Sequence, residues 1–185
     1  MSNDNFKELD YIEIMAIKDY GVGTRVCADF IDVLASNEGV LVGNTGYGFI
    51  KVMAETRKTD TYPPRPFRVN LGAINQYLYL GDNKTCYLSE LEPGMKIPVY
   101  DKDSLRFVTV GRVKNEKREF RRVECKNDGI EVSGIFQIAD SVFFQSVDDV
   151  FTSMNDLKPG IKLAYLKFEP GRHLGEKIEE EISEK

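Results

Sequence analysis

The spacing of short apolar runs most constrains how this chain can fold. Runs rich in Val, Ile, Phe and Tyr, such as "GVLVGN", "GFIKVMAET" and "QYLYLG", are separated by Gly, Asn, Asp or Pro at intervals of about ten residues. This punctuation is typical of a β-sandwich or barrel, and long helical periodicity is nearly absent. The sequence therefore predicts a mainly β fold with few short helices. Segments 29–36 and 146–154 are compatible with either short helices or turns.

An internal repeat relates two parts of the chain. "YLSELEPGMKIPVYD" (87–101) and "SMNDLKPGIKLAYLK" (153–167) share an acidic residue, Leu, a charged residue, Pro-Gly and a Lys before an aliphatic residue. Pro presets the first central position of a turn and Gly accepts the positive φ of the second, so each copy predicts a turn and then a strand. Residues 19–30 resemble a weaker third copy. Such turn-strand units predict small barrel-like lobes within one β-rich domain at 11–185, after a leader at 1–10.

The charge balance limits the classes of partner. A net charge of −5 argues against a general nucleic-acid-binding protein, because such a surface needs an excess of Lys and Arg to neutralise phosphates. The locally basic run 112–122 fits the solvated face of a strand pair better than a phosphate-binding patch. No aromatic ladder accompanies this run, so binding of single strands by base stacking has little support.

Cysteine usage and the N-terminal sequence bear on the compartment. Cys27, Cys86 and Cys125 are odd in number and widely spaced, which predicts reduced, mostly buried thiols rather than a zinc site or a disulfide framework. The N-terminus lacks a basic start with an apolar core, and no run approaches the roughly 20 apolar residues of a membrane helix. We therefore expect a cytoplasmic protein without a membrane-spanning segment.

The stretch "RPFRVN" is the strongest candidate for ligand binding. If residues 67–71 are extended, Arg68 and Asn70 lie on one face and the apolar residues on the other, while Arg65 is close by in the sequence. Such a group could grip a carboxylate or a phosphate. The alternative is a structural arginine that pairs with an Asp or Glu at the edge of the core.

Further candidates lie elsewhere in the chain. His173 is the only histidine and follows Arg172 on a segment bounded by glycines, where a surface loop without a role is the alternative. Glu55 is a candidate acid or base, although exposure is the commoner state of a glutamate. Gln137 and Asp140 in "FQIAD" precede an apolar run. The glycine-rich "GNTGYGF" (43–49) superficially resembles a phosphate loop, but it joins two expected strands, so a hairpin fits better. No metal site is indicated.

Taken in order, these motifs resemble a known family. The pieces "GVGTRVCADF", "GVLVGNTGYGFIKVMAET", "RPFRVNLGAINQYL", "KTCYLSELEPGMKI", "FQIAD" and "GRHLGEKIEEEI" resemble the C-terminal part of type II 3-dehydroquinate synthase, the archaeal-type enzyme of early aromatic biosynthesis. The likeness runs from about Tyr11 to the end. "RPFRVN" and "GRH" with "KIEE" are its most specific pieces.

The resemblance implies an NAD-dependent oxidative deamination of an aminodeoxy-heptulosonate, followed by cyclisation to 3-dehydroquinate. NAD is implied by the resemblance only, because the residues themselves show no cofactor loop. Full-length members of the family carry an additional N-terminal domain before this region, whereas this chain starts with its own Met and a short leader.

Matching positions supply the expected site. Met53-Ala54-Glu55 stands where the family has His-Ser-Glu, and Asn75 stands where it has His, so two proton-transfer groups are absent. Acid–base work then falls to Glu55, Asp140 and His173. The residues expected to bind an anionic small molecule are Arg65, Arg68, Asn70, Gln137 and Arg172.

Three roles follow from different classes of function. The chain is an enzyme or enzyme subunit that acts on a polyhydroxy carboxylate or a sugar-phosphate-type ligand. Alternatively, it is a non-catalytic ligand-binding or regulatory domain. In the third role, it completes a separately encoded partner that resembles the family's N-terminal domain. The sequence leaves a homo-oligomer open.

Overall fold

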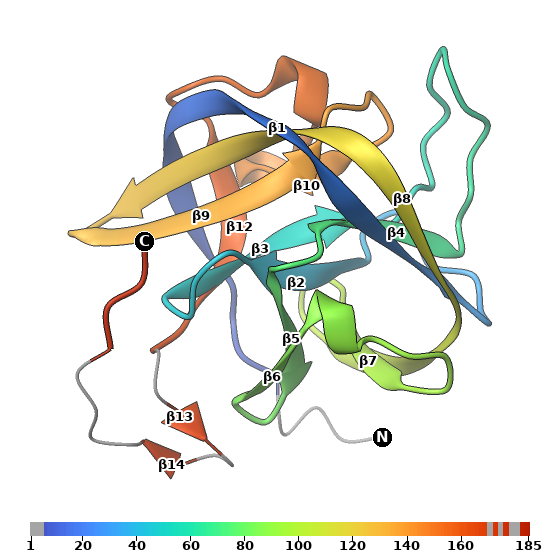
Figure 1. The fold of residues 1–185 in the computed structure, drawn as a ribbon, viewed down its shortest axis with the longest axis horizontal. Coiled ribbons are helices and arrows are strands. Elements are labelled where there is room, and N and C mark those ends of the chain that lie inside the picture. The colour runs from blue at the N-terminus through green and yellow to red at the C-terminus, as the bar shows by residue number, and fades with distance from the viewer. Residues whose placement is uncertain (1–5, 170–171, 174–175, 178–181) are drawn as a thin grey trace.

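The prediction of a mainly β chain with few short helices is confirmed. The computed structural model describes residues 6–169, 172–173, 176–177 and 182–185, with only the backbone described for 172–173 and 176–177 (Figure 1). Three short 3₁₀ helices, η1 (Leu88–Glu90), η2 (Val147–Asp149) and η3 (Met154–Asp156), interrupt the strands. The strands of the described residues are β1 (Asp10–Phe30), β2 (Gly39–Gly43), β3 (Gly48–Met53), β4 (Arg68–Ala73), β5 (Tyr77–Gly81), β6 (Lys84–Tyr87), β7 (Lys96–Tyr100), β8 (Leu105–Asn127), β9 (Ile130–Gln137), β10 (Phe143–Gln145), β11 (Phe151–Ser153), β12 (Lys162–Lys167), β13 (Arg172–His173) and β14 (Glu176–Lys177).

Strand pairing follows a ring. Hydrogen-bonded neighbours run from β3 through β12, β1, β8, β7 and β2 and return to β3. Every pair is antiparallel. The step from β2 to β7 rests on one residue pair, Gly39 with Tyr100, so the arrangement is ring-like rather than a regular barrel.

Two long strands form the spine of the molecule. β1 and β8 pair along most of their length and arch across the fold as one ribbon, with β4 added to β1 and β9 added to β8 (Figure 1). Residues 19–30, the weaker repeat, lie inside β1 rather than in a turn. Gly21, with φ of +91°, lies at a shift of register in β1 instead. Because one ribbon carries both β4 and β9, residues far apart in sequence meet at its centre.

The two repeat segments have the same local structure. Residues 88–90 and 154–156 are 3₁₀ turns, and each is followed by Pro-Gly and a strand, β7 or β12. Gly94 and Gly160 take φ of +94° and +97°, the conformation that a side chain disfavours. The Gly94 N–H donates to Val110 of β8, and the Gly160 N–H donates to Ile14 of β1. Each unit therefore docks on one strand of the central ribbon.

The largest buried cluster fills the space between these strands. It contains apolar side chains from ring strands, such as Ile14, Ile50 and Val108, and from the added strands, such as Val69 and Val132. Residues 31–38 form bends and turns after β1, so the turn alternative for segment 29–36 is confirmed. Every residue of β2, β3 and β4 is buried, including the polar residues Lys51, Arg68 and Asn70, because both faces of these strands are covered.

Candidate functional site

A small polar cavity lies where β4 and β9 approach each other on the central ribbon. Its volume is about 140 Å³. Five cationic side chains and two carboxylates line it, although the whole chain has a net charge of −5. We call it the polar pocket, and its lining residues are Arg25, Glu55, Tyr62, Arg65, Arg68, Asn70, Lys114, Glu116, Arg118, Gln137 and Ser141.

A bulge in β4 places Asn70 at the pocket. Val26 and Cys27 of β1 are opposite Gly72 and Asn70, so Leu71 is the extra residue. Gly72 has φ of +87°, and a Cβ there would lie 2.3 Å from the backbone oxygen of Ile135. Only glycine permits this close approach of β4 to β9. The approach brings the Asn70 Nδ2 within 2.8 Å of Gln137 Oε1 on β9.

Arg25 of β1 connects two other lining residues of the pocket, Gln137 on β9 and Glu116 on β8. Its Nη1 donates to Gln137 Oε1 at 2.6 Å, and its Nη2 donates to Glu116 Oε1 at 2.7 Å. The residue is only 5% exposed, and its Nε is buried without a hydrogen-bond partner among the described residues. A buried N–H without a partner costs free energy, so this donor is a feature that the fold alone does not explain.

Glu55 and Arg65 close the other side of the pocket. They form an isolated antiparallel bridge, in which the Arg65 N–H donates to the Glu55 backbone oxygen at 2.7 Å. Arg65 Nη2 forms an ion pair with Glu55 Oε1 at 2.6 Å whose alignment falls short of a hydrogen bond. In the described part of the chain, Oε1 and Arg65 Nε are both buried without a hydrogen bond. Burial raises the pKa of Glu55, and the nearby cations Arg65, Arg68 and Arg25 offset only part of that effect.

Arg68 is held by a carboxylate below the pocket. Its Nε and Nη2 donate to the two oxygens of Asp29 at 2.7 and 2.9 Å, and Arg112 Nε donates to Asp29 Oδ2 at 2.7 Å. Burial opposes ionisation of Asp29, but the hydrogen bonds from Arg68 and Arg112 outweigh it and lower the pKa. Arg68 thus lines the pocket with two of its three guanidinium nitrogens engaged by Asp29.

The remaining expected site residues lie at the rim or outside the described part. Asp140 is not in the lining, and its Oδ2 accepts a hydrogen bond from Thr61 Oγ1 at 3.0 Å, which ties the 56–64 loop to the rim beside Ser141. Tyr62 of that loop stacks on the Arg65 guanidinium, with 4.6 Å from Cζ to the ring centroid. Arg172 and His173 form β13, but their side chains lie outside the described residues.

Sequence reasoning missed the residues that β1 and β8 contribute. Arg25, Cys27 and Asp29 alternate in "TRVCADF", a pattern that could have signalled a polar face on an otherwise apolar strand. The Cys27 thiol is fully buried, and burial raises its pKa to about 11. Glu116 of the basic run holds Arg25, which is 91 residues away in sequence, and no local signal indicates that contact.

The basic run is largely neutralised by acids. Arg121 Nε lies 3.1 Å from Asp19, Arg122 Nε lies 3.0 Å from Glu124, and Arg118 contacts Glu116. This pairing fits the face of a strand pair, which was the favoured interpretation of residues 112–122. Lys114 and Arg118 also reach the pocket's rim.

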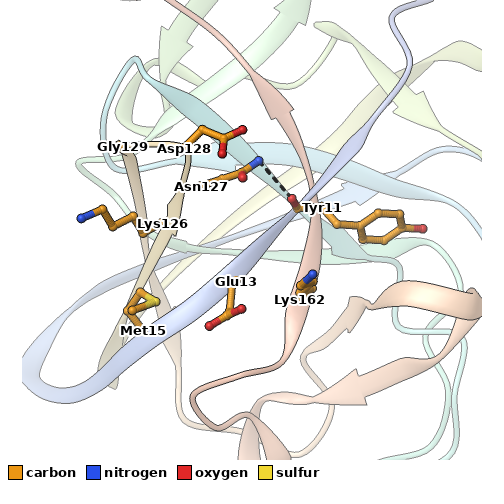
Figure 2. A pocket seen from close by; sticks show the side chains of 8 residues that line it. All are labelled: Tyr11, Glu13, Met15, Lys126, Asn127, Asp128, Gly129 and Lys162. Atoms are coloured by element: carbon orange, nitrogen blue, oxygen red, sulfur yellow. Dashed lines mark hydrogen bonds between the residues drawn. The ribbon is translucent and has the colours of Figure 1, made fainter.

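A second hollow is larger than the polar pocket but is lined by more exposed residues. It has a volume of about 290 Å³ between the start of β1, the β8–β9 turn and β12, and none of its eight lining residues is buried. Figure 2 shows that Lys126 and Tyr11 point in opposite directions, and that Asn127 bonds to the Tyr11 backbone oxygen at 3.4 Å. Because no buried charged group faces this hollow, we assign the candidate site to the smaller polar pocket.

The described residues do not fit a dinucleotide. The polar pocket is below the roughly 300 Å³ at which sites for drug-sized ligands begin. In the glycine-rich turn between β2 and β3, a Cβ on Gly43 would lie 2.4 Å from the Gly48 backbone oxygen, so this glycine serves strand pairing rather than phosphate approach. We therefore derive no step through NAD. In the same described part, no group of three or more His, Cys, Asp or Glu side chains is placed to hold a metal ion.

Comparison with known proteins decides the family. The model of the 3-dehydroquinate synthase II C-terminal domain matches residues 11–185. This chain belongs to that family. The match begins at Tyr11, where the motif resemblance also begins.

Curated relatives of this family are longer proteins. A "3-dehydroquinate synthase" of Methanopyrus kandleri is 38% identical over 182 residues, which cover 96% of this chain and 45% of the relative. A "3-dehydroquinate synthase homolog" of Aquifex aeolicus is 41% identical, and one of Persephonella marina is 40% identical, each over 96% of this chain and 54% of the relative. The chain thus spans about half the length of these relatives. No solved structure matches it. The described residues include no helix with the length and apolar character needed to cross a membrane.

Proposed function

We propose that the polar pocket binds an anionic polyhydroxy carboxylate or sugar-phosphate-type ligand. In this proposal the chain is a 3-dehydroquinate synthase II-like enzyme or enzyme subunit of aromatic or cyclic precursor metabolism. One observation carries the proposal: among the described residues, Arg25 Nε, Arg65 Nε and Glu55 Oε1 are buried without a hydrogen bond, although Oε1 is ion-paired to Arg65, and all three belong to residues of one pocket. Native proteins rarely leave such atoms unpaired, so a ligand that completes their bonds supplies a physical reason for them.

The chemistry of the three atoms defines the ligand class. Two guanidinium N–H groups suit an anionic oxygen, and their bonds to a charged partner are stronger than neutral ones. The Glu55 oxygen suits a ligand hydroxyl as acceptor, and the amides of Asn70 and Gln137 add neutral polar groups. An anion with neighbouring hydroxyls meets all these requirements.

Glu55 is the proposed proton-transfer group of the pocket. Burial raises its pKa, which brings a carboxyl closer to the neutral range in which it can both accept and return a proton. Asp140 at the rim is a second candidate. His173 and Arg172 stay candidates from the motif match, and their side chains are outside the described residues.

The family and its named relatives support the pathway assignment. Relatives at about 40% identity carry the name 3-dehydroquinate synthase or homolog of it, and this chain covers about half of each. The NAD-dependent steps of such an activity therefore fall to regions beyond the described pocket. That observation favours, as a second candidate, a subunit that completes a separately encoded partner.

Ligand binding by the purified chain tests the proposal. Quinate serves as a cyclic polyhydroxy carboxylate, glucose 6-phosphate as a sugar phosphate, and inositol as an uncharged control. At about 100 times its Kd, a bound ligand stabilises the fold by roughly 2.7 kcal/mol, which a thermal unfolding scan detects. Arg25→Gln should weaken binding roughly 10- to 100-fold, because a hydrogen bond to a charged group contributes about 1.5–3 kcal/mol.

Arg121→Gln is the matched control. It removes the same charge from β8, where Arg121 pairs with Asp19 outside the pocket, and should leave binding unchanged. If neither anion shifts the unfolding temperature of the folded chain, or if both variants behave alike, the proposed pocket is wrong. Turnover that appears only on mixing with the N-terminal region of a longer relative would support the subunit role.

A further inference from the structure

The turn between β2 and β3 holds a carboxylate from the chain's own C-terminal end. The Gly46 N–H donates to Glu184 Oε1 at 2.7 Å, and the Tyr77 O–H donates to Glu184 Oε2 at 2.8 Å. Each carboxylate oxygen therefore has one donor. The Tyr47 O–H also donates to the backbone oxygen of Ile182 at 3.3 Å. The C-terminus accordingly lies beside this hairpin (Figure 1).

The fold places both donors independently of Glu184. Gly43 pairs in register with Tyr77 of β5, which sets Tyr77 beside the turn. Its ring stacks on Tyr87 of β6, with ring centroids 5.1 Å apart. The Asn44 N–H donates to the Ser133 backbone oxygen at 2.9 Å and so anchors the turn to β9. The donor pair is thus built from paired strands and a tethered turn, which preorganises it for an anion.

The chemistry of the donors favours a carboxylate over a cation or a neutral group. A backbone N–H and a phenol O–H, each on a different oxygen, match the two acceptor atoms of one carboxylate. Burial, followed by the hydrogen bonds with Glu184 and Tyr87, raises the pKa of Tyr77, so the phenol keeps its proton in neutral solution. The same turn carries Thr45 Oγ1, a buried hydroxyl without a hydrogen-bond partner among the described residues.

We propose that Gly46 and Tyr77 form a carboxylate-binding site that Glu184 occupies as an internal ligand. A free small-molecule carboxylate takes the same two donors when Glu184 leaves. This site shares no lining residue with the polar pocket, so the proposal does not rest on the proposed function. Because Glu184 belongs to the same chain, it competes with a free carboxylate for the two donors and sets the ligand concentration at which the site fills.

Amide NMR of the full chain, labelled with ¹⁵N-glycine, tests the site. In Glu184→Ala, the Gly46 amide should lose its hydrogen bond and move upfield of its wild-type position. Sodium acetate should return it downfield, with an apparent affinity at least tenfold higher than in the wild type. Sodium chloride at equal ionic strength should not. Adding Tyr77→Phe to Glu184→Ala should weaken acetate binding roughly tenfold, because one of two donors is lost.

A control variant and three contrary results would test the assignment of this carboxylate site. Glu131→Ala removes the same charge from the surface of β9 and should leave the Gly46 amide at its wild-type position. An unchanged Gly46 resonance in Glu184→Ala would show that the contact does not form in solution. A resonance that shifts but does not respond to acetate would reduce the contact to packing of the chain end. Tighter binding of inorganic phosphate than of acetate would overturn the assignment to carboxylates.

Discussion

Two groups of buried charges adjoin each other in this molecule, and they differ in how completely they are paired. Arg68 donates two hydrogen bonds to Asp29, and Arg112 donates a third from the surface. Glu55 and Arg65 form an equally short ion pair, but their contact is misaligned and leaves Glu55 Oε1 and Arg65 Nε without a hydrogen bond among the described residues. The first group is a structural ion pair, whereas the second has the buried polar atoms on which the proposed ligand binding rests.

The pKa shifts of the two carboxyl groups run in opposite directions. The pKa of Asp29 is lowered because its hydrogen bonds outweigh burial, whereas the pKa of Glu55 is raised because burial outweighs its cations. The two carboxyl groups, Asp29 on β1 and Glu55 just after β3, therefore differ in their electrostatic environment. Completeness of hydrogen bonding, rather than proximity of charges, separates them.

The largest expected loss of stability is at the fully hydrogen-bonded pair, Asp29 with Arg68. Asp29→Ala leaves Arg68 buried without its carboxylate, and such a change typically costs about 3–5 kcal/mol. Urea unfolding should show this loss, whereas Asp32→Ala, at an exposed ion pair with Arg106, should stay within roughly 0.5 kcal/mol. Equal stability of the two variants would remove the distinction between the groups.

Lys51 tests whether burying a charge without an oppositely charged partner lowers the stability of the fold. Lys51 is 1% exposed and donates to Asn37 and Gln145 oxygens, which are neutral, and burial lowers its pKa to about 8. The unfolded chain holds this proton up to about pH 10.4, so wild-type stability should rise relative to Lys51→Met between those values. The expected gain is up to roughly 3 kcal/mol, measured by denaturant unfolding at each pH. A constant difference between the two proteins would contradict the shift.

A smaller change in stability is expected at the pair of Glu55 and Arg65. Glu55→Gln mimics the protonated carboxyl, and Arg65 keeps access to water because its side chain is 25% exposed. A raised folded pKa means that wild-type stability falls relative to this variant as the pH rises from about 4.3. The variant should therefore be as stable as the wild type or more stable at pH 7. Any turnover should fall roughly 10²- to 10⁴-fold. A clear loss of stability would make Glu55 a structural residue instead.

The smallest effect is expected at the rim. Asp140→Asn changes one side-chain contact of the 56–64 loop, the bond from Thr61, so stability should change by less than about 0.5 kcal/mol. Ligand affinity and turnover of this variant, compared with Glu55→Gln, indicate which carboxyl carries proton transfer. If Asp140→Asn lost as much affinity and turnover as Glu55→Gln, Asp140 at the rim would belong to the same functional group as Glu55.

Much of the fold was predictable because its signals are local. The Pro-Gly steps fixed two turns with positive φ at Gly94 and Gly160, and the apolar runs located most strands. The ring of pairings was not predictable, because it depends on contacts between strands far apart in sequence. The length of β1 was also missed, since residues 19–30 resembled a third turn-strand unit where the strand only shifts its register.

The residues of the candidate site also divide into those that the sequence predicted and those that only the structure revealed. Arg65, Arg68, Asn70, Glu55 and Gln137 were expected from "RPFRVN" and the motif match, and the structure brings all five to one pocket. Arg25 and Glu116 were not expected, because their contact joins β1 to β8 across 91 residues. The distinction between Arg68 and Arg65 was also out of reach, since it depends on whether a carboxylate on another strand has hydrogen-bond geometry.

The sequence by itself determined the β class, the turns and the family, because these follow from residue types at short spacing. Only the tertiary structure decided which charges are satisfied. A bulge at Leu71 and a glycine at position 72 bring β4 against β9, and that approach places Asn70 within 2.8 Å of Gln137. Hydrogen bonds weaken steeply with misalignment, so small differences in strand placement separate a structural ion pair from an open site.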